Sequence, residues 1–219
     1  MKKTLSLILA LSMLLSSCAA LAESLTLADV TGATEGTRYE NRALGFGLNL
    51  PEGWHFLNID ELETKNQFNW TRRNISYSLS DHLQDPVPEF SCMVMYAQQT
   101  DDPLARSIFV QVNDISREMD RYADGLAAVF DPVIAEGPKS SDVKNGDMTI
   151  HSDSCFKTMQ IDGGNCYVFE NNLVFNDEMP TYSKMIFLLK GHYYCTVSVS
   201  SATEDKTEEL LSLLFFLKD

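Results

Sequence analysis

The chain is poor in basic residues, with 17 Lys and Arg against 31 Asp and Glu and a formal net charge of −14. Phosphate backbones and anionic lipid repel such a chain, which argues against nucleic acid as a partner and against a protein that lies flat on a membrane. The sequence also lacks a G-x-S-x-G motif, an H-E-x-x-H motif, a glycine-rich phosphate loop and any internal repeat. The sequence therefore indicates a globular chain, and none of its motifs indicates a specific reaction.

The longest uncharged apolar run, Leu5 to Leu15, follows Lys2 and Lys3. This run is too short for a membrane-spanning helix, which needs about 20 apolar residues. A charged start, a short apolar run and a small-residue exit are typical of a secretory signal, which we place at residues 1–22. Without that signal the chain keeps 15 basic and 31 acidic residues, a net charge of −16. The protein is therefore expected to work outside the cytoplasm.

Two cleavage sites overlap at the end of the signal. Leu15-Ser16-Ser17-Cys18 is similar to a bacterial lipobox, in which the chain is cut after residue 17 and the Cys18 thiol carries lipid. Ala20-Leu21-Ala22 fits ordinary signal peptidase, which would release the protein. Acylation precedes cleavage, so we favour the lipoprotein, and both sites stay open. Membrane contact is expected only through an N-terminal lipid anchor, and only if the lipobox is used.

The mature chain divides into a short tether and one domain. Residues 23–37 are small and polar, which predicts a flexible tether, and the single domain spans residues 38–219. Alternating or β-branched runs predict strands near Phe46–Leu50, Phe90–Ala97 and Ser107–Val112. A meander follows over Met148–Ile161, Cys166–Phe175 and Lys184–Ser200, folded at Lys190-Gly191-His192.

Three segments have helical patterns. Asn58 or Asp60 is placed to cap a short helix, and Arg117 to Phe130 carries one apolar stripe that Pro132 should end. Thr203 to Leu213 follows a capping box of Ser201 and Glu204. Helices and an antiparallel meander in this order predict an α+β fold, an antiparallel β-sheet covered by helices.

The opening segment resembles the PsbP-like superfamily. Gly45-Phe46, Pro51, Gly53 and Trp54 match its signature, and the resemblance covers Tyr39 to Asp219. It implies an α/β/α sandwich, with helices on both faces of the sheet. It also implies non-catalytic binding, since the family includes extrinsic photosystem subunits, a regulator of a small GTPase and bacterial lipoproteins. No shared catalytic residue transfers to this chain.

Four cysteines remain after the signal, all in strand-like runs: Cys92, Cys155, Cys166 and Cys195. An even number in an exported chain permits disulfides, while apolar surroundings favour buried free thiols. If a bridge exists, Cys166–Cys195 is the pair we expect, through adjacent strands of the meander. A bridge between Cys155 and Cys166 is not expected, because a two-residue turn at Asp162-Gly163 would place Met159, not Cys155, opposite Cys166.

Two groups of residues could carry chemistry. His151, Asp153 and Cys155 alternate along one strand face, which offers zinc-type ligands. The spacing is wide for one ion, so we favour an edge strand whose polar residues face water. His192 and Cys195 fall on opposite strand faces, which argues against a thiol nucleophile. We therefore predict no catalytic residue, no metal and no cofactor.

The best single site in the sequence is an irregular aromatic and basic segment. Aromatic side chains beside paired arginines are typical of interface hot spots, and the residues are Phe68, Trp70, Arg72, Arg73 and Tyr77. We accordingly predict a non-enzymatic extracytoplasmic binding or assembly module for an unknown protein or small ligand. The alternatives are an envelope hydrolase or thiol redox enzyme, and a small-molecule or metal-binding protein.

Overall fold

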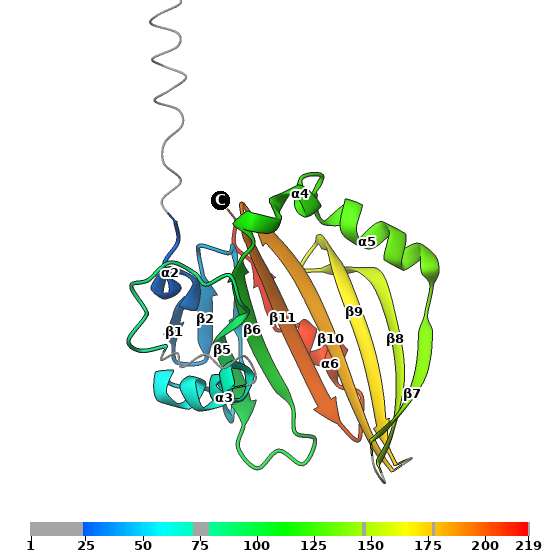
Figure 1. Cartoon of the computed structure of the whole chain (residues 1–219). Helices are drawn as coiled ribbons and strands as arrows, with labels where there is room; N and C mark the ends of the chain where they lie inside the picture. Colours follow the sequence, from blue (N-terminus) through cyan, green and yellow to red (C-terminus); the bar gives the residue numbers. More distant parts are fainter. Residues whose placement is uncertain (1–23, 72–78, 146–147, 177, 219) are drawn as a thin grey trace, which may run out of the picture.

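The computed structural model describes residues 24–71, 79–145, 148–176 and 178–218 (Figure 1), without the side chains of residues 66–71 and 145. The helices are α2 (Leu27–Thr31), α3 (Ile59–Thr71), the 3₁₀ turn η1 (Ser116–Glu118), α4 (Met119–Tyr122), α5 (Gly125–Glu136) and α6 (Thr207–Leu211). The strands are β1 (Ala33–Glu35), β2 (Arg38–Asn41), β3 (Phe46–Asn49), β4 (Trp54–Phe56), β5 (Cys92–Gln99), β6 (Ser107–Asp114), β7 (Lys139–Asn145), β8 (Met148–Ile161), β9 (Gly164–Phe175), β10 (Met179–Lys190), β11 (Tyr193–Ala202) and β12 (Leu214–Phe216). No helix in the described ranges is long and apolar enough to cross a membrane.

The strands form two sheets, and within the described residues all pairings between these strands are antiparallel. The large sheet has eight strands in the order β4-β5-β6-β11-β10-β9-β8-β7, and the small sheet has four in the order β1-β2-β3-β12. In the large sheet, β6 pairs with β11 across a long connection, while β7 to β11 follow one another as hairpins. The predicted α+β class with an antiparallel sheet is confirmed.

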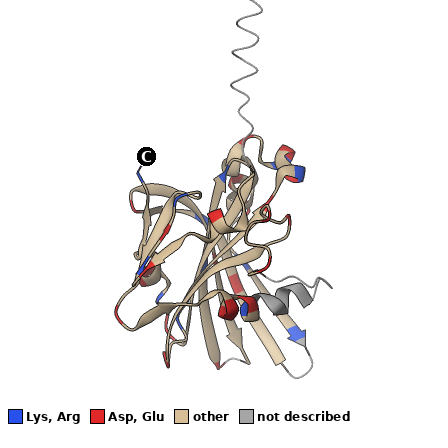
Figure 2. Cartoon of the chain, turned by 90° about the vertical axis from the view of Figure 1, so that its left-hand side faces the viewer, with Lys and Arg blue, Asp and Glu red and all other residues tan. Residues whose placement is uncertain are grey.

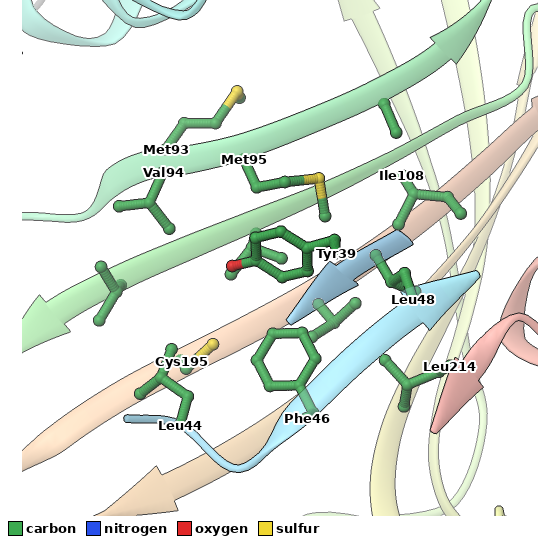
Figure 3. Packing of buried hydrophobic residues seen from close by; sticks show 14 of the residues in the cluster. Tyr39, Leu44, Phe46, Leu48, Met93, Val94, Met95, Ile108, Cys195 and Leu214 are labelled. Atoms are coloured by element: carbon green, nitrogen blue, oxygen red, sulfur yellow. The ribbon is translucent and has the colours of Figure 1, made fainter. Parts of the chain in front are cut away.

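The core lies between the small sheet and the inner face of the large one. Tyr39, Phe46 and Leu48 point from β2 and β3 toward Met95 and Ile108 of the large sheet (Figure 3). Their side chains are at most 3% exposed, because alternate residues of each strand face the partner sheet. A second sheet therefore shares the inner face with helices, which the sequence pattern did not anticipate.

Gly47 in β3 occupies a position where a side chain would not fit. A Cβ at Gly47 would lie 2.3 Å from Phe215 Cζ and 2.6 Å from the Tyr39 carbonyl oxygen. The aromatic ring of Phe215 in β12 therefore crosses β3 where no side chain fits. Trp54, at the end of the same signature, is 6% exposed and belongs to the core, as expected.

The tether prediction is wrong for α2 and β1. Leu27 and Val30 are fully buried in the core, and Asn41 Nδ2 donates to the Val30 carbonyl at 2.6 Å. The Leu25 N–H donates to the Tyr193 hydroxyl at 2.6 Å. The polar composition of residues 23–37 predicted a tether, but Leu27 and Val30 lie one helical turn apart and are buried together.

The helix ends also differ from the sequence expectation. Asn58 Oδ1 accepts from the Asp60 and Glu61 N–H groups, so the predicted cap of α3 is confirmed. Pro132, however, lies inside α5 rather than ending it, and the anchor of that helix is Phe130, 6% exposed. Ser201 belongs to β11, and α6 begins only at Thr207. Sheet pairing of Ser201 with Tyr182 outweighs the local capping signal.

Candidate functional site

Short hydroxyl side chains recur on one face of the large sheet. Ser152 and Ser154 alternate along β8, and Ser198 and Ser200 along β11. This face also carries α3, whose Lys65 ammonium lies 4.4 Å from the Tyr96 ring centre, and α5, whose Phe130 packs on the sheet. We call it the outer face, and it faces the viewer in Figure 1.

The strand register joins these side chains into one line, which we call the polar row. One polar residue from each of the eight strands stands directly opposite the next, since the residues are Cα partners from β7 to β4. The row reads Lys139, Ser154, Asn171, Ser183, Ser200, Ser107, Gln98 and His55. With neighbouring strands about 4.8 Å apart, it spans roughly 34 Å.

Burial and hydrogen bonding divide the polar row. Ser107 is 6% exposed and shares a 2.8 Å hydrogen bond with the Ser200 hydroxyl, so the β6 end is closed. Ser183 donates to the Asn171 carbonyl oxygen at 3.0 Å, and Ser152, one row below, donates to Asn171 Oδ1 at 2.9 Å. Ser154, Asn171 and Ser183 are half-buried, and Lys139 is exposed. Gln98 and His55 are also half-buried, beyond Ser107, and we call the stretch from the exposed Lys139 to Ser183, over β7 to β10, the accessible part.

An apolar row borders the polar row on the α5 side. Phe156, Phe169 and Met185 are Cα partners immediately on the α5 side. Phe130 holds α5 there, with ring centres 5.2 Å from Phe156 and 4.6 Å from Phe187. Aromatic pairs at such distances attract one another beyond simple burial.

A second apolar row lies two rows from the polar row, beyond the row that contains Ser152 and Leu173 and toward the far ends of β7 to β10. Its members are Val143, Ile150, Phe175 and Met179, paired across β7 to β10. Val143 is 53% exposed and Met179 61% exposed, the two large apolar side chains reported as exposed in the described ranges. An exposed apolar row beside polar groups is a feature of binding surfaces.

A cavity of about 210 Å³ connects the α5 side to the polar row. Val133 and Gly137 at the end of α5 form one wall, Phe156 and Phe169 form the floor, and Ser154 and Lys139 are at its polar side. The cavity is thus largely apolar, with few polar groups, as small-ligand sites commonly are.

The inner face beyond the core is charged instead. Lys184 is only 3% exposed along its side chain, and its ammonium lies 3.2 Å from Glu208 of α6 and 3.7 Å from Glu170 of β9. Lys157 also pairs with Glu170, and that hydrogen bond raises the Lys157 pKa. Burial opposes ionisation of Asp205, but two hydrogen bonds from Thr207 outweigh it and lower its pKa. These ion pairs join Lys157 and Lys184 to Glu170, and the pair of Lys184 with Glu208 links α6 to the sheet.

His151, Asp153 and Cys155 lie on the inner face of β8, and the first two form a surface network. His151 Nδ1 is 2.7 Å from Asp142 Oδ1, and its Nε2 is 3.2 Å from Asp153 Oδ2. The hydrogen bond with Asp142 first, and that with Asp153 second, raise the His151 pKa. Ser140 also donates to Asp153, which lowers the pKa of that carboxyl. Within the described ranges no group of three or more ligand side chains is arranged for a metal.

The cysteines are free thiols, and the expected Cys166–Cys195 bridge is wrong. Cys166 lies on β9 and Cys195 on β11, and β10 separates the two strands. The register argument itself is confirmed, since Met159 stands opposite Cys166. Burial raises the Cys92 pKa to about 12 and that of Cys195 still further, so neither thiol ionises near neutral pH.

The aromatic and basic segment predicted as an interface falls mostly outside the described residues. Arg72, Arg73 and Tyr77 lie beyond them, as does Cys18. Phe68 and Trp70 belong to α3, but their side chains are not described. Their roles therefore stay predictions.

Sequence reasoning missed the polar row because its members come from eight separate strands. The signal that could have found part of it was the alternation of Ser152 and Ser154 with His151, Asp153 and Cys155. The second set faces inward, whereas Ser152 and Ser154 face outward. The alignment with Asn171, Ser183 and Ser200 depends on pairing that no local pattern encodes.

Comparison with known proteins finds similarity to a solved structure but none to a family model or a curated sequence. No family model matches the chain, and no curated protein sequence matches it. The structure is similar to the solution structure of cyanobacterial PsbP from Synechocystis sp. PCC 6803, at 10% identity. The match covers 84% of this chain and 98% of that chain, with a TM-score of 0.39. A score below 0.5 carries no argument about function, so the α+β assignment rests on the strand order above and membership of the PsbP-like superfamily stays a prediction.

Proposed function

We propose that the protein is a non-enzymatic extracytoplasmic binding module, tied to a bacterial envelope by lipid on Cys18. The observation that carries the binding role is the polar row, whose accessible part lies between two apolar rows on an open sheet face. A flat face of this composition offers directional hydrogen bonds and apolar contact together, as recognition surfaces do.

The position of the face supports this function. The described chain begins beside α2, whereas the free ends of β7 to β10 point to the opposite corner of the molecule (Figure 1). A chain held by its N-terminus would therefore present the accessible part of the outer face away from its anchor. The buried, un-ionised thiols of Cys92 and Cys195 fit a structural role for these cysteines rather than nucleophilic catalysis.

Binding to isolated envelope fragments tests the proposal, by co-sedimentation of the purified chain without its signal. Asn171→Lys places a long charged side chain in the polar row, and Asn172→Lys makes the same change one residue on, on the inner face. We expect Asn171→Lys to lower the bound fraction severalfold and Asn172→Lys to leave it near that of the wild type. Equal binding by the wild type and Asn171→Lys would contradict the proposed binding face.

A further inference from the structure

We propose that the outer face binds an extended, uncharged glycan across β7 to β10. This inference deepens the proposed function and rests on it. The binding surface consists of the polar row from Lys139 to Ser183, the neighbouring row that contains Ser152, and the aromatic side chains of Phe169 and Phe175 that flank them.

The hydrogen-bonding groups suit hydroxyl-rich ligands. Hydroxyl and amide side chains both donate and accept, as the hydroxyls of a sugar do. Asn171 Oδ1 already accepts from Ser152, and among the described residues no partner takes up its Nδ2 donors. Ser154 likewise has no side-chain partner in the described ranges. Both residues are half-buried, so a ligand can reach these groups while much of their desolvation has already occurred.

The outer face over β7 to β9 has few charged side chains, which favours an uncharged ligand. Strands β7 to β9 alternate so that Asp142, Asp153 and Glu170 all face inward, where they pair with His151 or lysines. The outward residues between them are Ser, Asn and apolar side chains, with Lys139 as the charged member at the edge of the accessible polar row. Figure 2 shows Asp and Glu mainly on loops and helices rather than along the strands. The polar row is therefore neutral over most of its length in a strongly acidic protein.

The apolar rows can contact the C–H groups on the faces of sugar rings. Pyranose rings present C–H groups on their faces, and these pack on aromatic rings. Phe169 forms part of the floor of the cavity of about 210 Å³, directly beside Ser154. Phe175 lies half-buried two rows away, on the opposite side of Ser152 and Asn171. Sugar rings lying over the polar band would thus meet an aromatic side chain on either side.

The length of the accessible row sets the size of the ligand. From β7 to β10 there are three strand spacings, or roughly 14 Å at about 4.8 Å each. This length exceeds one sugar ring, and the repeat of an extended glycan is close to one strand spacing. The surface therefore fits an oligosaccharide that runs across the strands rather than a monosaccharide.

Calorimetric titration with cellohexaose and with chitohexaose tests the inference, and the two probes distinguish a plain glucan from an N-acetylated one. We expect at least one to bind, and Asn171→Ala to weaken that binding about fivefold, the effect of losing a hydrogen bond to the ligand. Phe169→Leu, which keeps the residue apolar, should weaken it without unfolding the protein. Asn172→Ala is the matched control on the inner face and should bind as the wild type does.

Failure of this inference can be told apart from failure of the proposed function. If neither hexasaccharide binds while Asn171→Lys still lowers binding to envelope fragments, the glycan is wrong and a protein partner occupies the face. If Asn171→Ala and Asn172→Ala weaken a hexasaccharide equally, the glycan does not lie on the outer face. If the outer-face variants change neither assay, both proposals are overturned.

Discussion

Removing the ring of Phe130 should detach α5 and open the wall of the outer-face cavity. Phe130 is 6% exposed, with ring centres 5.2 Å from Phe156, 5.5 Å from Tyr167 and 4.6 Å from Phe187. Truncation of a buried phenylalanine to alanine typically costs about 3–5 kcal/mol. In a chain of this size each kcal/mol lowers Tm by roughly 2–4 °C, so Phe130→Ala should melt roughly 6–20 °C below the wild type.

Scanning calorimetry and urea unfolding followed by near-UV circular dichroism measure this loss. The matched control is Asp131→Ala, the next residue, which is exposed and accepts one hydrogen bond from the Tyr167 hydroxyl at 2.9 Å. Its loss should change stability by less than about 1 kcal/mol, since an exposed hydrogen bond contributes little net free energy. Equal melting of Phe130→Ala and Asp131→Ala would show that α5 does not pack on the sheet through this ring.

Four further outcomes are expected. Cys18→Ala should move the protein from the membrane fraction to the medium, as blotting of cell fractions would show. Trp54→Ala should cost about 3–5 kcal/mol in chemical unfolding, since that side chain is 6% exposed in the core. Thiol labelling of the native protein should modify Cys155 first and Cys195 only on unfolding, because Cys195 is fully buried. The His151 imidazole should titrate above its ordinary pKa of about 6.5 in NMR spectra, and Asp142→Asn should bring the midpoint down.

The raised His151 pKa also predicts how the stability of the protein changes with pH. A pKa that is raised in the folded state means that the proton binds more tightly there than in the unfolded chain. The stabilisation of the β7–β8 hairpin is therefore complete below the unfolded pKa of about 6.5 and is lost as pH rises through the folded pKa. A stability that rises with pH over that range in the wild type, relative to His151→Gln, would contradict the network.

Results at the other three sites can also contradict the predictions made for them. Identical fractionation of wild type and Cys18→Ala would exclude the lipid anchor. A Trp54→Ala protein that unfolds like the wild type but loses a ligand would make Trp54 a binding residue. Non-reducing peptide mapping that finds a Cys166–Cys195 linkage would show that β10 does not separate their strands.

The sequence by itself determined the strands of the meander and which of their side chains point to the inner face of the sheet. Cys195, Val197 and Val199 alternate with polar neighbours, and a strand has only two faces, so the inward side followed directly. The turn at Asp162-Gly163 fixed Met159 opposite Cys166, because a two-residue loop leaves one register. These features are local, and each is decided by residues within one hairpin.

Only the tertiary structure decided which distant strands and short segments meet. The sequence around Leu27 and Val30 is typical of a tether, but both side chains are buried in the core. Ser201 fits a helix cap in the local sequence, but it pairs with β10 in the sheet. The pairing of β6 with β11 joins residues far apart in the chain, and it completes the polar row from Ser200 to Ser107. Because a shift of one residue in any pairing would move these side chains to the other face, the outer face exists only in the assembled sheet.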